Sequence, residues 1–528
     1  MKKWLYALMI LLVIFQAACS KETEGNQVEV GTDENLNETG MPIVNEPITI
    51  KMFAGMAAKT QRNWDDILVW NTYEEMTNVH IDWEQVPQEG GDEKRNLALA
   101  GGNLPDVFYA ANMPTLDLFK YGQQGLFLEL NDLIDLYAPN LKKLMEENPE
   151  IRKAITFPDG KIYSLPVIHD PEFISVRTHP LPCFNQEVLD AVGMDIPEST
   201  TEFYQFLKAV QKEIPDITPF GGRDMNGLIG WLRGSFAVGT TGRSFIDKDP
   251  ETGDIRFYPI TDEYKDMLEY IHKLYSEKLI EQNIYTIELA SFLANGKDEK
   301  YASTVFYAPV ELFGEEAGEN YVGGLPLAGP NGDQVFAQLA NPVGHIGKFV
   351  LTNENPNPAA TIRWVDYFYS DEGSRLFYMG VEGETYEVTD DGDYKYLDKI
   401  THSEDGISKD EKITNYLAWL GVGAPGILKE DYFDGSEAAP QALEAAMKVE
   451  PYLIDEAWPP FTYTDEEAEK LAALSADIEK YVNEMQDKFI VGEESFEKWD
   501  TFIKNIEKMG LAEYMEIQKT AYKRYQNN

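Results

Sequence analysis

The sequence of 528 residues has few cysteines and few basic residues. Its cysteines are Cys19 and Cys183. Cys19 lies at the end of an N-terminal apolar run and is interpreted as a modified residue rather than half of a disulfide. Cys183 then has no partner, and we expect the fold to use no disulfide. The 45 Lys and Arg residues are outnumbered by 91 Asp and Glu residues, and the formal net charge is -46. This charge excludes a nucleic-acid partner, because no basic stripe would outweigh it.

Motifs of enzymes and metal sites are also missing. The 6 histidines show no H-x₃-H or HExxH spacing, and no G-x-S-x-G elbow or P-loop occurs. Cys183 has no recognisable Cys–His arrangement and is interpreted as a buried thiol. Asp247, Asp249 and Asp254 lack the full ligand spacing of a calcium loop, so a solvated turn is favoured. We therefore expect no metal, no cofactor and no catalysis. The alternative is an extracellular glycoside hydrolase, because the many acidic residues could supply the pair of carboxylates that such an enzyme needs.

The N-terminus carries the strongest local signal. Lys2 and Lys3 precede an apolar run from Trp4 to Phe15, which is too short to span roughly 30 Å of hydrocarbon. Together with the small residues that follow, this pattern predicts a signal peptide over residues 1–18. Ala17-Ala18-Cys19 resembles the lipobox of bacterial lipoproteins, with Gln16 where Leu is usual. That resemblance implies a diacylated Cys19; the alternative is ordinary secretory cleavage beside a chance cysteine.

The chain after Cys19 divides into a tether and a large folded body. Residues 19–46 are acidic and nearly free of aromatics, which predicts a flexible acidic tether. The remaining chain is too long for one simple core and predicts two domains. Hydrophobic residues make up 43% of the sequence, enough for a large core.

Strands and helices alternate at the start of this body. Alternating apolar residues predict strands at 48–55 and 79–86, and an apolar run predicts a third strand at 104–110. Helices are expected between them at 65–78 and 93–102. This order implies a parallel sheet whose ligands bind beyond the carboxyl ends of the strands. Further on, helices are expected at 197–213 and 262–280, a hairpin lies between them, and the C-terminal part from residue 465 is helical.

Several segments resemble one protein family when taken in order. They are NLALAGGNLPDVFYA, DGKIYSLP, the segment from Cys183 to Val210, SDEGSRLFYMGVEGETYEV, PPFTYTDEEAEKL and the last segment from Lys488 to Tyr525. The chain is thereby similar to family 1 extracellular solute-binding proteins, in their Gram-positive lipoprotein branch. The resemblance covers about residues 47 to 525.

This resemblance implies an α/β fold of two lobes, the type II periplasmic-binding-protein-like fold, with a hinge and a helical C-terminal segment. Residues 47–170 would form mainly the first lobe and 171–345 mainly the second. Residues 346–528 would supply return crossings and C-terminal helices that pack on both lobes. The implied function is a lipid-anchored receptor of an ABC importer on the extracellular face of the cell membrane. Its partners would be the permease subunits and an oligosaccharide, while a sensor for a receptor kinase would use the same cleft.

A sugar site needs aromatic faces and polar groups, and six residues are candidates for it. Trp231 lies in a Gly-rich stretch that the resemblance assigns to the cleft wall, with a packed core Trp as the alternative. Tyr109 and Asn112 follow the third strand at its carboxyl end, and Tyr307 has a similar position in the second lobe. Arg223 and Asp224 precede Trp231 and complete the set.

Other tryptophans are weaker candidates for this site. Trp70, Trp83 and Trp364 are assigned to the core by their spacing. For Trp64 the sequence favours neither a core position nor a cleft position. Trp419 and Trp458 are flanked by loops rich in Gly or Pro.

Overall fold

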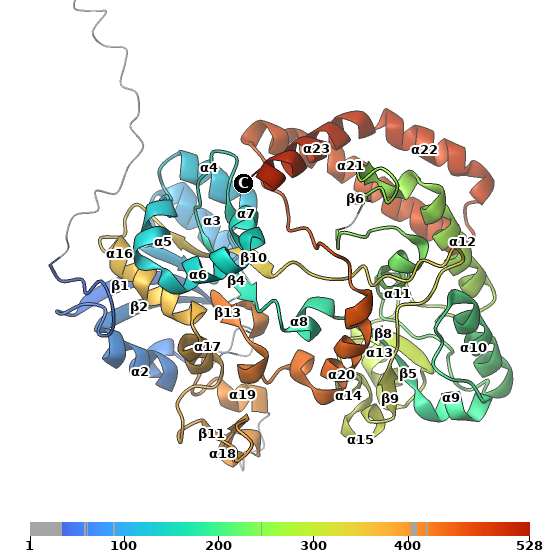
Figure 1. Ribbon diagram of the computed structural model, residues 1–528, viewed down its shortest axis with the longest axis horizontal. Coiled ribbons are helices and arrows are strands. Elements are labelled where there is room, and N and C mark those ends of the chain that lie inside the picture. Colours follow the sequence, from blue (N-terminus) through green and yellow to red (C-terminus); the bar gives the residue numbers. More distant parts are fainter. Residues whose placement is uncertain are drawn as a thin grey trace, which may run out of the picture.

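The computed structural model has two lobes joined side by side (Figure 1). It describes residues 34–56, 60, 62–87, 90–243, 245–402, 409–418 and 421–527. The predicted signal peptide at 1–18 and the lipidation site Cys19 lie outside these residues. Each lobe has its own large apolar core, one built mainly from residues 43–173 and 343–433 and the other mainly from residues 181–336 and 445–525.

A six-stranded sheet forms the centre of the first lobe. Its strand order is β13-β4-β10-β3-β1-β2. The strands are β1 (Ile48–Met56), β2 (Val79–Pro87), β3 (Val107–Tyr109), β4 (Leu165–His169), β10 (Val343–Leu351) and β13 (Gly426–Leu428). β1 pairs in parallel with β2 and β3, whereas β10 is antiparallel to β3 and β4. The predicted β-α-β-α-β order is confirmed, but the third strand starts later than expected because Pro105 has no N–H to donate.

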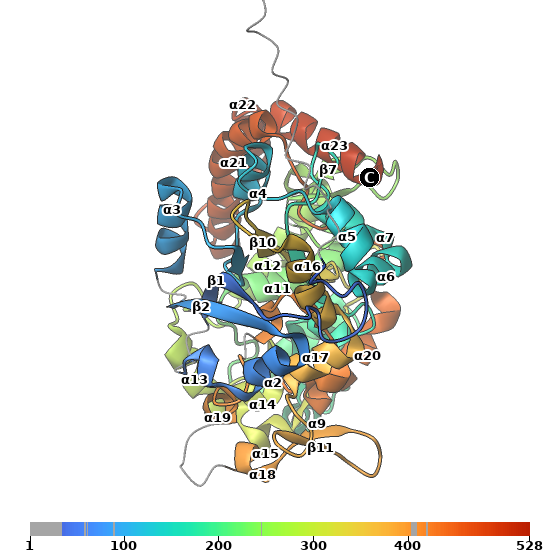
Figure 2. The same cartoon turned by 90° about the vertical axis from the view of Figure 1, so that its left-hand side faces the viewer.

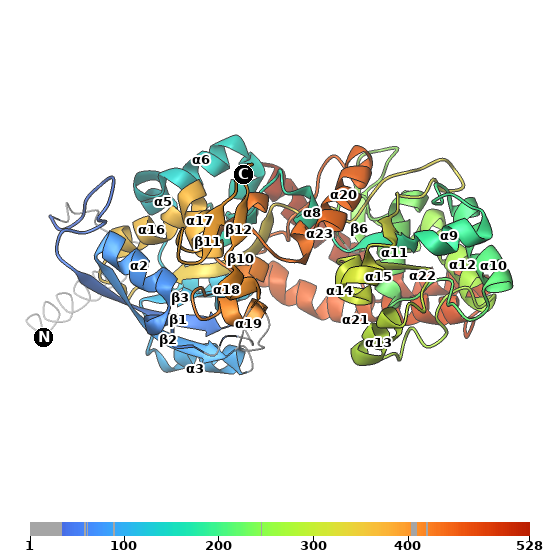
Figure 3. The same cartoon turned by 90° about the horizontal axis from the view of Figure 1, so that it is seen from below.

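Helices flank this sheet, with α3 on one side and α5, α6 and α16 on the other (Figures 2 and 3). The helices of the first lobe are α2 (Leu68–Thr77), α3 (Gly91–Gly101), α4 (Thr115–Gln123), α5 (Asn131–Tyr137), α6 (Pro139–Glu147), α7 (Pro149–Ile155), α16 (Pro358–Asp366), α17 (Asp371–Tyr378), α18 (Asp398–Thr401) and α19 (Lys409–Ile413). A small hairpin of β11 (Tyr386–Val388) and β12 (Tyr394–Tyr396) completes it.

The second lobe contains an antiparallel sheet of three strands, β8-β5-β9, and a separate hairpin, β6-β7. The strands are β5 (Leu181–Asn185), β6 (Ile246–Lys248), β7 (Ile255–Phe257), β8 (Ser303–Phe306) and β9 (Tyr321–Gly323). The helices are α9 (Gln186–Val192), α10 (Thr200–Glu213), α11 (Met225–Leu232), α12 (Asp262–Ser276), α13 (Leu289–Lys297), α14 (Pro309–Phe313) and α15 (Glu315–Gly318). The hairpin and the two expected helices are confirmed, and Ser199 caps α10 by accepting from the Glu202 N–H.

Three crossings connect the lobes at one edge of the large sheet. The first leaves β4 through α8 (Ile174–Thr178), the second enters β10, and the third leaves β13 for α20 (Pro440–Val449). The crossings are hydrogen-bonded to each other: the Ala340 N–H donates to the Arg177 carbonyl at 2.7 Å, and the Asp170 N–H donates to the Leu428 carbonyl at 2.9 Å. They therefore form one connection between the lobes.

The C-terminal helices form a further bridge, which Figure 1 shows along one side of both lobes. They are α21 (Asp465–Val491), α22 (Trp499–Lys508) and α23 (Leu511–Asn527). α21 packs against α12 in the second lobe and touches α4 in the first, while α23 touches α7. The start of α21 is a capping box in which Thr464 and Glu467 bond each other's backbone N–H.

The described part of the expected tether is folded. Ile43 and Val44 are fully buried in the first core, and the Ile43 N–H donates to the Thr77 carbonyl at 3.0 Å. Asn37 and Gly40 offer carbonyls to the Arg363 guanidinium. The prediction of a flexible tether is therefore wrong for residues 34–46, because the short apolar run MPIV docks beside α2.

Gly55 sets how closely β1 and β3 approach at their carboxyl ends. A Cβ on Gly55 would lie 2.3 Å from the Ala110 carbonyl oxygen, so only glycine fits without moving the backbone. Ala110 has a φ of 50°, which places the chain after β3 in the left-handed region.

Gly55→Ala is expected to lower the free energy of unfolding by about 1–3 kcal/mol, because the added methyl group overpacks a rigid backbone contact. Urea unfolding of the purified protein measures this. Gly101→Ala, where no atom lies within 4 Å of the new Cβ, is the control and is expected to be neutral or stabilising. Equal stabilities of the two variants would contradict the role given to Gly55.

Candidate functional site

A pocket of about 160 Å³ lies at the carboxyl edge of the large sheet. It is lined by Phe53, Gly55, Met56, Val86, Pro87, Gly91, Asp92, Ala110, Ala111, Asn112, Lys348 and Gly423. The ends of β1, β2 and β3 supply most of these residues, and β10 supplies Lys348. The three crossings to the second lobe start or end at this same edge of the sheet. Parallel sheets bind ligands at such edges.

Asn112 and Lys348 are the polar pair of this pocket. Lys348 Nζ donates to Asn112 Oδ1 at 2.5 Å. Asn112 has a φ of 51°, a left-handed conformation that Asn tolerates better than most residues. A Cβ on Gly423 would lie 3.2 Å from Lys348 Nζ, so glycine leaves room for the ammonium group. Asn112 was a predicted site residue, and the structure places it in this pocket.

The electrostatics of the pocket come from buried cations. Lys348 is 8% exposed, and burial lowers its pKa to about 8. Arg95 lies behind the pocket, where its guanidinium donates to Asp92 at 2.7 Å and to the Ala111 carbonyl at 2.9 Å. Burial, with the positive charges of Lys348 and Arg95, lowers the pKa of His345 to about 4. Lys348 therefore places a buried positive charge in the lining of this pocket, while the charge of Arg95 is paired with Asp92.

Tyr109 lies in the first core and has no surface open to a ligand. It is fully buried and packs edge-on against Trp64 at 5.9 Å and Trp83 at 5.4 Å between ring centroids. The expectation that it lines the cleft is wrong, because β3 turns its side chain into this aromatic cluster. Trp64, Trp70 and Trp364 are buried with it, and this settles Trp64 as a core residue.

Trp231 lies in the second core. It is 1% exposed, its ring packs edge-on against Phe203 at 5.0 Å, and its Nε1 donates to the Leu325 carbonyl at 3.0 Å. This burial contradicts the expectation that the indole stacks on a sugar ring. The glycines around it serve packing: a Cβ on Gly230 or Gly234 would collide with the second crossing, at 2.1 Å and 1.7 Å.

Tyr307 is the exposed aromatic residue among the predicted six, with 45% of its surface accessible. It follows β8, and its ring is parallel to that of His179 at 6.4 Å between centroids. His179 follows α8, so Tyr307 lies beside the first crossing. Figure 1 shows β8 and α14 on the side of the second lobe that is turned toward the first, and Figure 3 shows α14 there as well.

Arg223 and Asp224 precede α11, which packs on β8. Asp224 caps this helix by accepting from the Asn226 N–H at 2.9 Å, and Arg223 approaches the Asp224 carboxylate at 3.4 Å. Both side chains are substantially exposed. Asp224 therefore has a structural role, while the Arg223 guanidinium reaches solvent.

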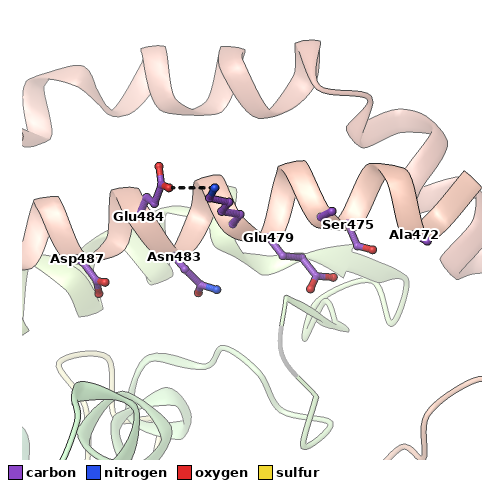
Figure 4. Close-up of a pocket in the computed structure, with 8 residues that line it drawn as sticks. Ala472, Ser475, Glu479, Asn483, Glu484 and Asp487 are labelled. Carbon is purple, nitrogen blue, oxygen red and sulfur yellow. Dashed lines mark ion pairs between the residues drawn. The ribbon is translucent and has the colours of Figure 1, made fainter. Parts of the chain in front are cut away.

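A larger hollow of about 660 Å³ runs along one face of α21 (Figure 4). Ala472, Ser475, Ala476, Glu479, Lys480, Asn483, Glu484 and Asp487 line it. All of them come from one helix, and the hollow is an open polar surface without aromatic residues or strand ends. We therefore assign the candidate site to the smaller pocket at the sheet edge.

The acidic hairpin β6-β7 holds an ion pair. Asp247 is fully buried and accepts from Arg256 Nε at 2.8 Å and from the Gly239 N–H at 2.8 Å. The expectation of a solvated turn is thus wrong for Asp247. Asp249 lies in the exposed turn, where it accepts from the local Glu251 and Thr252 backbone N–H groups and lies 3.8 Å from the Arg256 guanidinium. The described residues contain no cluster of three or more His, Cys, Asp or Glu side chains that would hold a metal ion.

Cys183 and Trp458 are both buried. Cys183 lies in β5, where burial raises the pKa of its thiol to about 12, as expected for an inert thiol. Trp458 is 4% exposed, and Trp419 lies outside the described residues. Among the helices of the described chain, none is both long and apolar enough to cross a membrane.

Comparison with known proteins identifies the class. Residues 57–375 match the family model for bacterial extracellular solute-binding proteins, and the chain belongs to that family. The two-lobed type II fold is thereby confirmed, as is the recognition of the family.

Particular relatives can also be named. The fructooligosaccharide ABC transporter substrate-binding protein FusA of Streptococcus pneumoniae is 27% identical over 98% of this chain and 97% of its own length. A solved structure of FusA, an EF-hand mutant in complex with fructo-nystose, has a TM-score of 0.72 at 26% identity, covering 91% of this chain and 100% of that one. The polygalacturonan/rhamnogalacturonan-binding protein YtcQ of Bacillus subtilis is 29% identical over 42% of this chain and 44% of its own. These relatives are binding proteins rather than enzymes, which supports the expectation of no catalysis.

Sequence reasoning missed Lys348 and Gly423. Lys348 interrupts the apolar strand GHIGKFVL, and a lysine in a buried strand was the available signal. Gly423 gave no signal in the sequence, because Lys348, the residue it lies beside, is distant along the chain.

Trp231→Ala is expected to lower the free energy of unfolding by about 3–5 kcal/mol, the cost typical of removing a core Trp. Ligand affinity of the protein that remains folded should stay within about threefold of wild type, a change of under 1 kcal/mol. Denaturant unfolding and calorimetric titration on the same preparation measure both. A tenfold loss of affinity at normal stability would place the indole in the binding site after all.

Proposed function

We propose that this protein is the lipid-anchored extracellular receptor of an ABC importer and binds an oligosaccharide between its two lobes. The observation that carries the proposal is the pocket of Asn112 and Lys348 at the carboxyl edge of the sheet, the same edge from which the crossings lead to the second lobe, where Tyr307 is exposed. The names of FusA and YtcQ support a carbohydrate ligand.

The chemistry of the two surfaces fits a sugar. Tyr307 offers an aromatic ring that covers the C–H face of a pyranose or furanose. Asn112 and Lys348 offer hydrogen-bond donors to hydroxyl or carboxylate oxygens. Arg223 contributes a further exposed donor in the second lobe. An aromatic surface on one lobe and donors on the other would enclose a sugar from both sides.

The connection between the lobes suits hinge closure. Hydrogen bonds join the first crossing to the second and to the third, and in our proposal they keep the crossings together as the lobes rotate. Hinges of this kind absorb the change in a few backbone dihedrals while both lobes stay rigid. In our proposal, the permease subunits of the transporter then recognise the closed form, and Cys19 anchors the protein on the extracellular face of the membrane.

The purified chain from Glu34 onward is expected to bind oligosaccharides and leave them intact. Calorimetric titration against fructooligosaccharides and pectic oligosaccharides measures binding, and chromatography after prolonged incubation tests for cleavage. Tyr307→Ala should weaken binding about ten- to a hundredfold, because losing a stacked ring costs roughly 1–3 kcal/mol. Leu136→Ala, which truncates a 59% exposed side chain on α5, serves as the control. Turnover that survives repurification would instead favour a glycoside hydrolase.

Cys19→Ser is expected to release the protein from membranes into the medium, because two acyl chains on Cys19 would supply the stable anchor. Membrane fractionation followed by immunoblotting measures the distribution. A variant that stays in the membrane fraction to the same extent as wild type would overturn the anchor.

A further inference from the structure

Lys348 is a buried cation without an anionic partner. Lys348 is 8% exposed. In the described part of the chain, no carboxylate oxygen lies within 4.0 Å of its Nζ atom. Its described partner is Asn112 Oδ1, a neutral acceptor. Burying a charge is costly unless it is paired, so native proteins seldom leave a lysine in this state without a use.

Hydrogen-bond donors exceed acceptors around this ammonium group. A lysine carries three N–H donors, and the contact with Asn112 uses one of them. Because Asn112 Oδ1 faces the ammonium group, its Nδ2 is left as another donor in the exposed part of the side chain. A ligand that presents electron-rich oxygens would therefore complement this pocket better than one that must donate.

The charges nearby do not neutralise Lys348. Asp92 also lines the pocket, but its carboxylate pairs with Arg95 at 2.7 Å and is mostly in solvent. The lowered pKa of Lys348 has burial as its cause, and the positive charges of Lys348 and Arg95 help to lower the pKa of His345. A protein of net charge -46 repels anions at long range, so binding an anionic ligand requires such a local positive site.

We propose that this pocket binds the carboxylate group of an acidic oligosaccharide, a chain of uronic acids, with Lys348 as its ionic partner and Asn112 as a second donor. The inference rests on the proposed binding function and specifies its ligand class. Gly423 keeps the space beside Nζ open. The name of YtcQ, which specifies an acidic polysaccharide, guides the choice of probe.

The test compares trigalacturonate with its fully methyl-esterified form and with a neutral fructooligosaccharide in calorimetric titrations at pH 7. We expect trigalacturonate to bind at least about tenfold more tightly than the ester, because a charge-assisted contact replaces a neutral one. Above pH 8 its affinity should fall by up to about tenfold per pH unit, because the free protein must then take up a proton on Lys348 to bind. The affinity for neutral ligands should not change with pH in this way.

Lys348→Met is the decisive variant, and Lys94→Met is its matched control. Both remove one positive charge, but Lys94 lies outside the pocket lining, where it pairs with Glu84 at 2.7 Å. Lys348→Met should abolish the preference for the acid over the ester, with a melting temperature equal to or above that of wild type. Lys94→Met should keep the preference.

The outcomes separate the two proposals. Binding of the neutral sugar with no preference for the acid, or an acid preference that survives Lys348→Met, would overturn the carboxylate site and leave the receptor function intact. Binding of no oligosaccharide at all would overturn the proposed function and this inference together.

Discussion

The three crossings at one edge of the six-stranded sheet are the constraint on which the rest of the structure depends. β4 and β13 leave the first lobe there, and β10 enters it, so that edge adjoins the second lobe. Hydrogen bonds such as that from Ala340 to Arg177 hold the crossings together. Because parallel strands of the same sheet end at this edge, the pocket and the connection between the lobes occupy neighbouring space. In our proposal, this topology links ligand binding to lobe closure.

The pocket itself depends on close backbone approach. Gly55 lets β1 meet the chain after β3, and β10 inserts antiparallel beside β3, bringing Lys348 next to Asn112. The ammonium group is buried at a cost that its lowered pKa reflects. Stability given up at one residue is common where a protein binds a ligand, because the ligand supplies the missing partner. The left-handed residues Ala110 and Asn112 and the buried Lys348 lie together at this pocket.

In both lobes, the burial of aromatic side chains differs from what the local sequence suggests. Trp231 has polar and glycine neighbours, yet those glycines let the second crossing pack against α11, and the indole ends up in the core. Tyr109 stands at a strand end, yet its side chain faces the cluster around Trp64. Tyr307, at a similar strand end, faces solvent beside His179. Chain position alone thus predicts proximity to the edge but not the direction of a side chain.

The sequence by itself determined the family, the parallel order of the first three strands, the capped helices α10 and α21, and the position of Asn112 at the sheet edge. These follow from local periodicity, caps and turns, which act over a few residues. Only the tertiary structure decided which tryptophans are buried, that residues 34–46 dock on α2, and that Lys348 and Gly423 complete the pocket. Those outcomes depend on contacts between segments that are separated in the sequence, from 34 residues for Ile43 with Thr77 to 236 residues for Lys348 with Asn112, and no local pattern encodes the packing that brings them together.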